Sequence, residues 1–145
     1  MRPLYETERD LSNEEKVLAY LVEKWALSGW LKLSLSYGLD YALCRLPGQI
    51  SSYAEIKVRP GLSPGFGDGY YLSLHKVMRA REINSETGAP CHLVVNFPGN
   101  EDSIWRADMF SHKDGCIVAG RKDRGDPLDQ EPHVVYPWEA FRQLR

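Results

Sequence analysis

The feature that most constrains the fold is the segment Cys91 to Phe97, which is rich in apolar residues and has no regular polar alternation. Its length suits a strand, and a strand of this kind is usually buried on both faces at the centre of a sheet. A helical pattern precedes it, from about Leu72 to Glu86, and Gly88 ends that pattern. The segment therefore predicts an α/β fold in which helices flank a central mixed sheet.

The residues before these two elements predict a helix, three strands and a loop. The helix runs from about Asn13 to Leu27, with Ser12 as its N-cap and Glu15 completing a capping box. Alternating apolar residues and turn signals then place the strands at 30–36, 39–45 and 52–59. The following stretch, 60–69, is rich in glycine and proline, so we expect an irregular loop beside the third strand.

Weaker patterns follow Phe97. We assign them to strands at 103–109, 115–120 and 133–136, a charged surface loop at 121–132 and a helix at 138–144. Pro137 suits the first turn of that last helix, because proline has no amide hydrogen to leave unpaired there. The predicted order is therefore α-β-β-β-α-β, followed by a small C-terminal β/α extension.

The composition suits one globular domain. The chain has 145 residues, of which 43% are hydrophobic and 11% aromatic, and that is enough to enclose a core. We expect a single domain over 1–145, with a core over about 11–97 and an extension over about 98–145. No apolar run is long enough to cross a membrane, and residues 1–6 lack the apolar stretch of a signal peptide, so we expect a soluble intracellular protein.

Charge and cysteine content limit the classes of function. A formal net charge of −2 does not by itself indicate a nucleic-acid binder. A phosphate-binding face needs only local positive potential, however, and carboxylates that hold metal ions lower an enzyme's net charge. Cys44, Cys91 and Cys116 lie far apart and form no CxxC pair, which argues against a disulfide framework and a structural zinc site.

Three charged residues on two predicted strands form the strongest functional candidate. Glu55 and Lys57 are two positions apart, so both side chains leave the same face of their strand, opposite Ala54, Ile56 and Val58. Asp40 lies on the preceding strand, and a hairpin would bring it beside Glu55. Two carboxylates and an ammonium group would then meet on one patch of the sheet.

Such a patch has the groups that phosphodiester hydrolysis needs. Mg²⁺ takes oxygen ligands, usually one or two carboxylates together with waters and substrate phosphate. Asp40 and Glu55 would be the ligands, with the backbone carbonyl of Ile56 as a third. Lys57 would position the attacking water or stabilise charge on the phosphate. A solvated charged face on an ordinary sheet would produce the same pattern, so this alternative remains open.

Asp40, followed by Glu55-Ile56-Lys57 and a helix with a further basic residue, resembles the PD-(D/E)xK nuclease superfamily. That superfamily includes restriction endonucleases, Holliday-junction resolvases and phage recombination nucleases. Its core runs helix, three-stranded meander, helix and strand, which is the predicted order over about 11–97. The chain departs from the motif in having Leu39, not proline, before the aspartate.

The resemblance implies a restriction-endonuclease-like fold and a Mg²⁺-dependent nuclease, with Mn²⁺ as an alternative ion and DNA as substrate. It adds a glutamate from the first helix to the metal ligands, for which Glu14 is favoured over Glu15. It also makes Lys76, on the second helix, a contact to the scissile phosphate. The small size suggests a phage or mobile-element enzyme that acts on DNA ends or branched DNA in an infected host, in some members as a homodimer. A non-catalytic interaction module and an RNA-directed nuclease are the alternatives.

Overall fold

The computed structural model describes residues 8–120 and 130–145. In chain order the elements are α1 (Glu8–Lys24), β1 (Gly29–Lys32), the 3-10 helix η1 (Leu35–Tyr37), β2 (Tyr41–Leu46), β3 (Gln49–Val58), β4 (Tyr70–Ser73), α2 (Leu74–Thr87), β5 (Cys91–Phe97), β6 (Ser103–Asp108), β7 (Ile117–Ala119), β8 (Glu131–Tyr136), the 3-10 helix η3 (Trp138–Ala140) and β9 (Arg142–Gln143).

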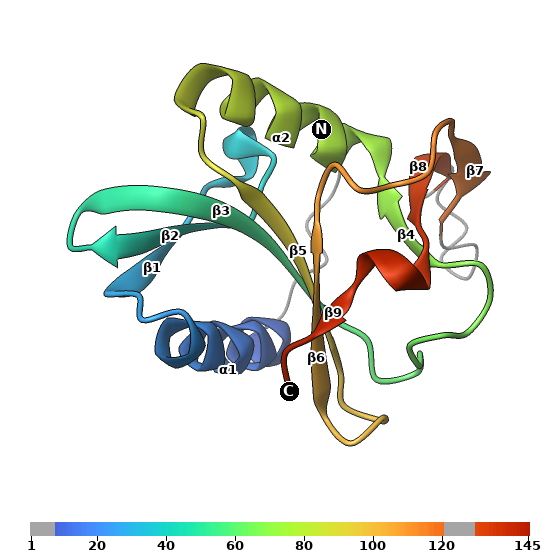
Figure 1. Ribbon diagram of the computed structural model, residues 1–145, viewed down its shortest axis with the longest axis horizontal. Coiled ribbons are helices and arrows are strands. Elements are labelled where there is room, and N and C mark those ends of the chain that lie inside the picture. The colour runs from blue at the N-terminus through green and yellow to red at the C-terminus, as the bar shows by residue number, and fades with distance from the viewer. Residues whose placement is uncertain (1–7, 121–129) are drawn as a thin grey trace.

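A mixed sheet forms the centre of the molecule, and its strand order among the described residues is β1-β2-β3-β5-β6-β9. Strands β3 and β5 are parallel, with Glu55 level with Leu93, and the other neighbours in this sheet are antiparallel. Helix α2 lies in the crossover between the two parallel strands. Helices α1 and α2 cover opposite faces of the sheet (Figure 1), which confirms the predicted flanked mixed sheet.

Each face of the sheet has its own apolar core. On the α1 side, Leu18 and Leu21 pack against strand residues that include Ile56 and Val94. On the other side, α2, β4 and β8 pack against the alternate residues of the same strands, among them Leu93 and Val95. Strand β5 is buried on both faces, as its apolar sequence predicts.

A second, smaller sheet has the order β4-β8-β7. Strand β4 comes directly before α2 and is not predicted from the sequence, because its four residues fall between a loop and a helix. Its alternation is clear in the structure: Tyr70 and Leu72 are buried, whereas Tyr71 is exposed. Helix α2 consequently begins at Leu74, with the Ser73 hydroxyl accepting a hydrogen bond from the His75 amide, and not at about Leu72.

The first helix differs from its prediction at both ends. It begins no later than Glu8, so Ser12 and Glu15 lie within the helix and the predicted capping box is wrong. The acidic residues Glu8 and Asp10 lie in the first turn, where the helix dipole favours negative charge. The last turn ends at Lys24, because Ala26 adopts a positive φ of 53°. None of the described helices is long and apolar enough to cross a membrane.

The strand predicted at 30–36 is shorter, because β1 ends at Lys32 and the chain forms η1 before β2. The strand predicted at 115–120 is β7, trimmed to Ile117–Ala119. Most of the loop predicted at 121–132 lies outside the described residues, and β8 already begins at Glu131.

The predicted terminal helix is wrong. The chain forms a single 3-10 turn, Trp138–Ala140, and then pairs with β6 as strand β9. Tertiary contacts outweigh the local helical preference here. Phe141 is buried beside Tyr70 and Tyr136, and the Leu144 amide donates to the Ile104 carbonyl at 2.7 Å.

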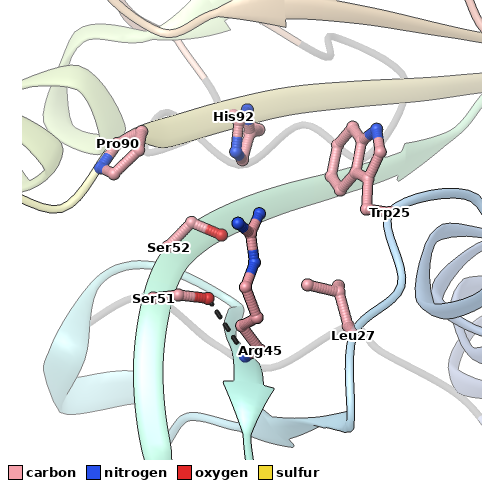
Figure 2. A pocket seen from close by; sticks show the side chains of 7 residues that line it. All are labelled: Trp25, Leu27, Arg45, Ser51, Ser52, Pro90 and His92. Carbon is pink, nitrogen blue, oxygen red and sulfur yellow. Dashed lines mark hydrogen bonds between the residues drawn. The ribbon is translucent and has the colours of Figure 1, made fainter.

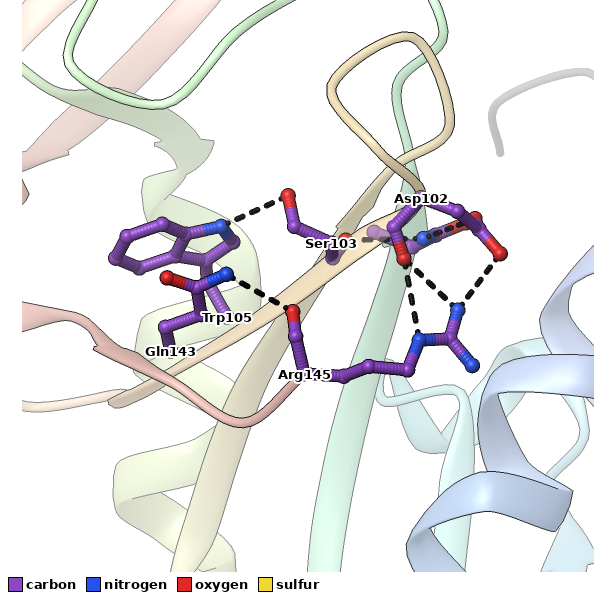
Figure 3. A network of polar contacts seen from close by, with 6 residues as sticks. Asp102, Ser103, Trp105, Gln143 and Arg145 are labelled. Carbon is purple, nitrogen blue, oxygen red and sulfur yellow. Dashed lines mark hydrogen bonds and ion pairs between the residues drawn. The ribbon is translucent and has the colours of Figure 1, made fainter.

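Polar contacts hold this end of the chain against the β5–β6 turn (Figure 3). The Arg145 guanidinium donates to the Asp102 carbonyl and lies 2.7 Å from its carboxylate. The residues after Phe97 therefore contribute β6 and β9 to the main sheet, as well as β7 and β8 to the smaller one.

Candidate active site

Two carboxylates and two lysines converge on the α2 side of β3. Lys57 Nζ lies 3.1 Å from Glu55 Oε2, and Lys76 Nζ lies 3.4 Å from the same oxygen. Lys76 Nζ also lies 3.4 Å from Asp40 Oδ1. The structure therefore brings together four of the predicted site residues: Asp40, Glu55, Lys57 and Lys76.

Glu55 and Lys57 lie near the C-terminal end of β3, on the face opposite Ala54 and Ile56. The same-face geometry is the one that their spacing predicts. Their environments differ, because the Glu55 side chain is completely buried, whereas 24% of the Lys57 side chain is exposed. Lys57 thus connects a buried carboxylate with solvent.

Asp40 lies immediately before β2 and not within it. Its backbone carbonyl accepts a hydrogen bond from the Leu33 amide at 2.9 Å, and the neighbouring Leu39 is buried in the core. These contacts fix the backbone, so the carboxylate is aimed at Lys76 from the end of the strand. Its side chain is 22% exposed.

Arg79 holds the segment that carries Asp40, and this role is not among those predicted from the sequence. Its Nε donates to the Tyr37 carbonyl at 2.6 Å, while its Nη1 lies 2.7 Å from the Glu82 carboxylate. The residue after Tyr37 is Gly38, with a φ of 78°, and an added Cβ there would lie 2.8 Å from Arg79 Cγ. A glycine before the aspartate, facing an arginine on the next helix, was the available signal.

Burial and the two lysines give the two carboxylates opposite pKa shifts. Burial raises the pKa of Glu55, and the negative charge of Asp40 adds to that rise, although Lys57 and Lys76 oppose it. Burial, the largest single influence, would also raise the pKa of Asp40, but Lys76, Lys57, the neighbouring Glu55 carboxyl group and Lys32 together outweigh it, so its pKa lies below the usual value. Burial tends to lower the pKa of Lys57, yet Glu55 and Asp40 raise it overall, so Lys57 stays charged.

The Glu55 carboxylate is also short of hydrogen bonds. Neither of its oxygens receives a directed hydrogen bond from a described residue, although two ammonium groups lie nearby. A buried charged group without such partners is expensive to maintain. The arrangement therefore fits a carboxylate that has a ligand still to bind.

The backbone carbonyl of Ile56 lies beyond the last residue pair between β2 and β3. Pairing between β2 and β3 ends with Tyr41 opposite Ala54. Backbone groups two positions apart point the same way, so the Ile56 carbonyl points past the start of β2, toward the position that Asp40 occupies. The amides of Tyr53 and Arg59, at alternate positions, bond on the β5 side instead.

Glu14 is placed on the other side of the sheet, where α1 packs. Its Oε1 accepts a hydrogen bond from the Tyr41 hydroxyl at 2.8 Å. Tyr41 belongs to the core on the α1 side and follows Asp40 directly. Glu15 is exposed on the same helix. Among residues 8–120 and 130–145 there is no group of three or more His, Cys, Asp and Glu side chains arranged to hold a metal ion.

The comparison with protein families decides what kind of protein carries this arrangement. Residues 1–144 match the family model described as "Phage putative PDDEXK endonuclease". The chain belongs to this phage PDDEXK endonuclease family. As a member of it, the chain is a nuclease, which confirms the resemblance that Asp40, Glu55 and Lys57 carry.

A solved structure supports the fold of the PDDEXK chain. The Holliday junction resolvase Hjc of the archaeal hyperthermophile Archaeoglobus fulgidus superposes with a TM-score of 0.56 at 14% sequence identity. The match covers 92% of this chain and 90% of the resolvase, so the PDDEXK chain has the restriction-endonuclease-like fold. No match is found among the curated proteins.

Proposed function

We propose that the chain is a metal-dependent deoxyribonuclease whose active centre consists of Asp40, Glu55 and Lys57, with Lys76 beside them. Glu55 carries the proposal, because its carboxylate is fully buried and lacks directed hydrogen bonds from the described residues. A divalent cation coordinated by the carboxylate would compensate such a charge better than the two neighbouring ammonium groups do.

The available donors fit a hard divalent cation. Asp40, Glu55 and the Ile56 carbonyl offer oxygen atoms from neighbouring backbone positions, and Mg²⁺ commonly combines one or two carboxylates with waters and substrate phosphate. Mn²⁺ accepts the same kind of oxygen donors. Glu14, whose carboxylate accepts a hydrogen bond from the Tyr41 hydroxyl, is a further proposed ligand because the family resemblance implies it.

The two lysines have separate proposed roles. A bound divalent cation supplies polarisation of the phosphoryl oxygen and a more acidic water. Lys57, held charged by the two carboxylates, donates hydrogen bonds to the attacking water or to a phosphate oxygen and stabilises the charge that develops. Lys76, from the start of α2, contacts the scissile phosphate and screens the two carboxylates from each other while the site is empty of substrate.

DNA is the proposed substrate, in the form of ends or branches. The family is described as phage endonucleases, and the fold is shared with a protein named as a Holliday junction resolvase. We propose that the enzyme acts inside a phage-infected host cell, where a homodimer would allow paired cuts. Cleavage of RNA by the same site is the alternative, and the assay below includes RNA for that reason.

Cleavage assays test the proposal. Purified protein is incubated with Mg²⁺ or Mn²⁺ and with linear, nicked, branched and single-stranded DNA, and with RNA of matched sequence. We expect DNA cleavage that a chelator abolishes, and a loss of about a hundredfold or more in Lys57→Ala. Lys113→Ala, at an exposed lysine that makes no ion pair with the cluster, is the matched control.

Equal activity of wild type and Lys57→Ala on every substrate would refute the catalytic assignment. DNA binding without metal-dependent turnover would identify the chain as a non-catalytic nuclease-like module. Preferential cleavage of RNA would keep the site and change the substrate.

A further inference from the structure

A pocket lies on the α1 side of the sheet, the face opposite Glu55 and Lys57. It has a volume of about 450 Å³, within the range of small-ligand sites. The lining residues come from the α1–β1 connection, from β2 and β3 and from the start of β5; they are Trp25, Leu27, Arg45, Ser51, Ser52, Pro90 and His92. None of them belongs to the proposed active centre.

The walls of the pocket combine an aromatic surface with apolar side chains. The Trp25 indole packs against the His92 ring, with 4.9 Å between the ring centroids and 40° between the planes. Leu27 and Pro90 complete the apolar lining, and Figure 2 shows these groups arranged around the Arg45 side chain. A planar ring of a ligand could stack or pack here, because base stacking on aromatic side chains needs no particular sequence.

Two polar side chains of the pocket, those of Arg45 and Ser52, have no partner among the described residues, whereas the Ser51 hydroxyl donates to the Leu43 carbonyl. The Arg45 side chain extends into the opening between Ser52 and Trp25 (Figure 2), and its guanidinium makes no ion pair or hydrogen bond with a described residue. Ser52 as a residue is nearly buried, and its hydroxyl likewise has no hydrogen bond within the described part of the chain. An unpaired guanidinium beside an unpaired hydroxyl is suited to a phosphate group.

His92 adds a third donor. Its Nδ1 accepts a hydrogen bond from Arg106 Nε at 2.9 Å, so in the neutral ring the proton lies on Nε2. Burial, together with the charge of Arg106, lowers the pKa of His92 to about 4, which keeps the ring neutral at physiological pH. The ring therefore presents one N–H group and no additional charge.

The end of α1 does not oppose an anion in this position. Helix C-termini carry partial negative charge on unpaired carbonyl groups. Here the carbonyls of Leu21 and Val22 accept hydrogen bonds from the amides of Trp25 and Leu27. Arg45 consequently supplies the one formal charge among the lining residues while His92 is neutral.

From these contacts we infer that the pocket binds a nucleotide unit, with its base against Trp25 and its phosphate on Arg45 and Ser52. The nucleotide is either a free nucleoside monophosphate or one residue of a single strand. The inference does not depend on the proposed catalytic function, because the pocket and the carboxylate cluster lie on opposite faces of the sheet.

Calorimetric titration in the presence of a chelator tests this binding without cleavage. The ligands are deoxyadenosine monophosphate, deoxyadenosine, inorganic phosphate and a 5′-phosphorylated six-nucleotide oligothymidylate. We expect the monophosphate to bind, and deoxyadenosine and phosphate each to bind about tenfold more weakly, because each lacks half of the contacts.

Arg45→Gln should weaken binding of the monophosphate by about tenfold or more, since the substitution removes the charged hydrogen bonds. Its side chain is exposed, so the variant should fold, and thermal melting checks this. Trp25→Leu should also weaken binding, whereas Trp30→Leu is the matched control, because Trp30 lies on β1 and outside the pocket. Glu55→Gln should leave monophosphate binding unchanged even if it abolishes cleavage.

The oligonucleotide separates the two sources of the ligand. An oligonucleotide that binds more tightly than the monophosphate and loses affinity in Arg45→Gln identifies a strand as the occupant. Equal or weaker binding of the oligonucleotide identifies a free nucleotide. The inference is overturned if the monophosphate does not bind at millimolar concentration, or if it binds wild type and Arg45→Gln equally.

Discussion

At the scale of single residues, the unusual group is the Glu55 carboxylate. It is fully buried, and two ammonium groups of Lys57 and Lys76 lie within 3.4 Å of one of its oxygens. Even so, burial together with Asp40 raises the pKa of Glu55, so the surroundings favour the protonated form. The ionised Glu55 side chain therefore lowers the stability of the folded state, as is common where a site must bind a charged ligand.

The first prediction concerns stability without metal. Because its pKa is raised on folding, Glu55 contributes stability that is present below the unfolded pKa and lost as pH rises through the folded pKa. Glu55→Gln should therefore raise the free energy of unfolding at pH 7 by about 1 kcal/mol, with a smaller gain near pH 4. Urea denaturation at both pH values, with exposed Glu15→Gln as control, measures the difference. A loss of stability at pH 7 would instead identify Glu55 as a structural ion-pair partner.

The second prediction concerns metal affinity. A ligand carboxylate must be deprotonated to bind a metal ion. Because the pKa of Glu55 is raised, the metal affinity should begin to decrease, as pH is lowered, at a higher pH than for an ordinary glutamate. Below that pKa the Mn²⁺ dissociation constant should rise by about tenfold per pH unit. Calorimetric titrations from pH 8 down to pH 5 check this. A pH dependence of the affinity that is the same in wild type and in Glu55→Gln would remove Glu55 from the ligand set.

At the scale of elements, the site depends on how β2 begins. Asp40 lies just outside β2, in a segment that Arg79 of α2 holds through the Tyr37 carbonyl. The same helix carries Lys76. One helix therefore positions a lysine and an aspartate relative to the buried Glu55.

Gly38 provides the third prediction. Its φ of 78° disfavours any side chain, and a Cβ would lie 2.8 Å from Arg79 Cγ. Gly38→Ala should therefore lower the free energy of unfolding by about 2 kcal/mol and reduce cleavage, because Asp40 shifts with the segment. Gly48→Ala is the matched control, since its φ is 70° but nothing lies within 4 Å of the added Cβ. Equal losses in the two variants would show that the Arg79 contact is unimportant.

Part of this arrangement could be predicted from the sequence. Residues two apart on one strand must share a face, so the Glu55–Lys57 pair follows from strand geometry. The strand β4, by contrast, depends on a partner, β8, far along the chain, and its four residues carry no pattern long enough to identify it. The role of Arg79 depends on a hydrogen bond to a distant carbonyl, which no local pattern encodes.

At the scale of the whole molecule, the C-terminal residues complete the main sheet. A helix was predicted there because Pro137 suits a first turn, but pairing with β6 and burial of Phe141 decide the structure. Tertiary contacts of this kind override a weak local preference. The edge of the main sheet beside β6 is therefore formed by β9, the last strand in the sequence order.

The fourth prediction ranks the contacts that hold this edge. Phe141→Ala should lower the free energy of unfolding by about 3 kcal/mol, because it leaves a cavity between Tyr70, Tyr136 and Trp138. Arg145→Ala should cost less than about 1 kcal/mol, since both partners of its ion pair with Asp102 are exposed. Chemical denaturation of the two variants compares them. The reverse order would mean that the polar network, not the aromatic cluster, anchors β9.

The proposed activity of the whole molecule requires Asp40 and Glu55 to hold a divalent cation together. Calorimetric titration of Mn²⁺ into wild type, Asp40→Asn, Glu55→Gln and Glu15→Gln at pH 8 tests it most directly. We expect wild type and Glu15→Gln to bind one ion with similar affinity, and each of the two site variants to bind at least about tenfold more weakly. Unchanged Mn²⁺ binding in both Asp40→Asn and Glu55→Gln would contradict the claim.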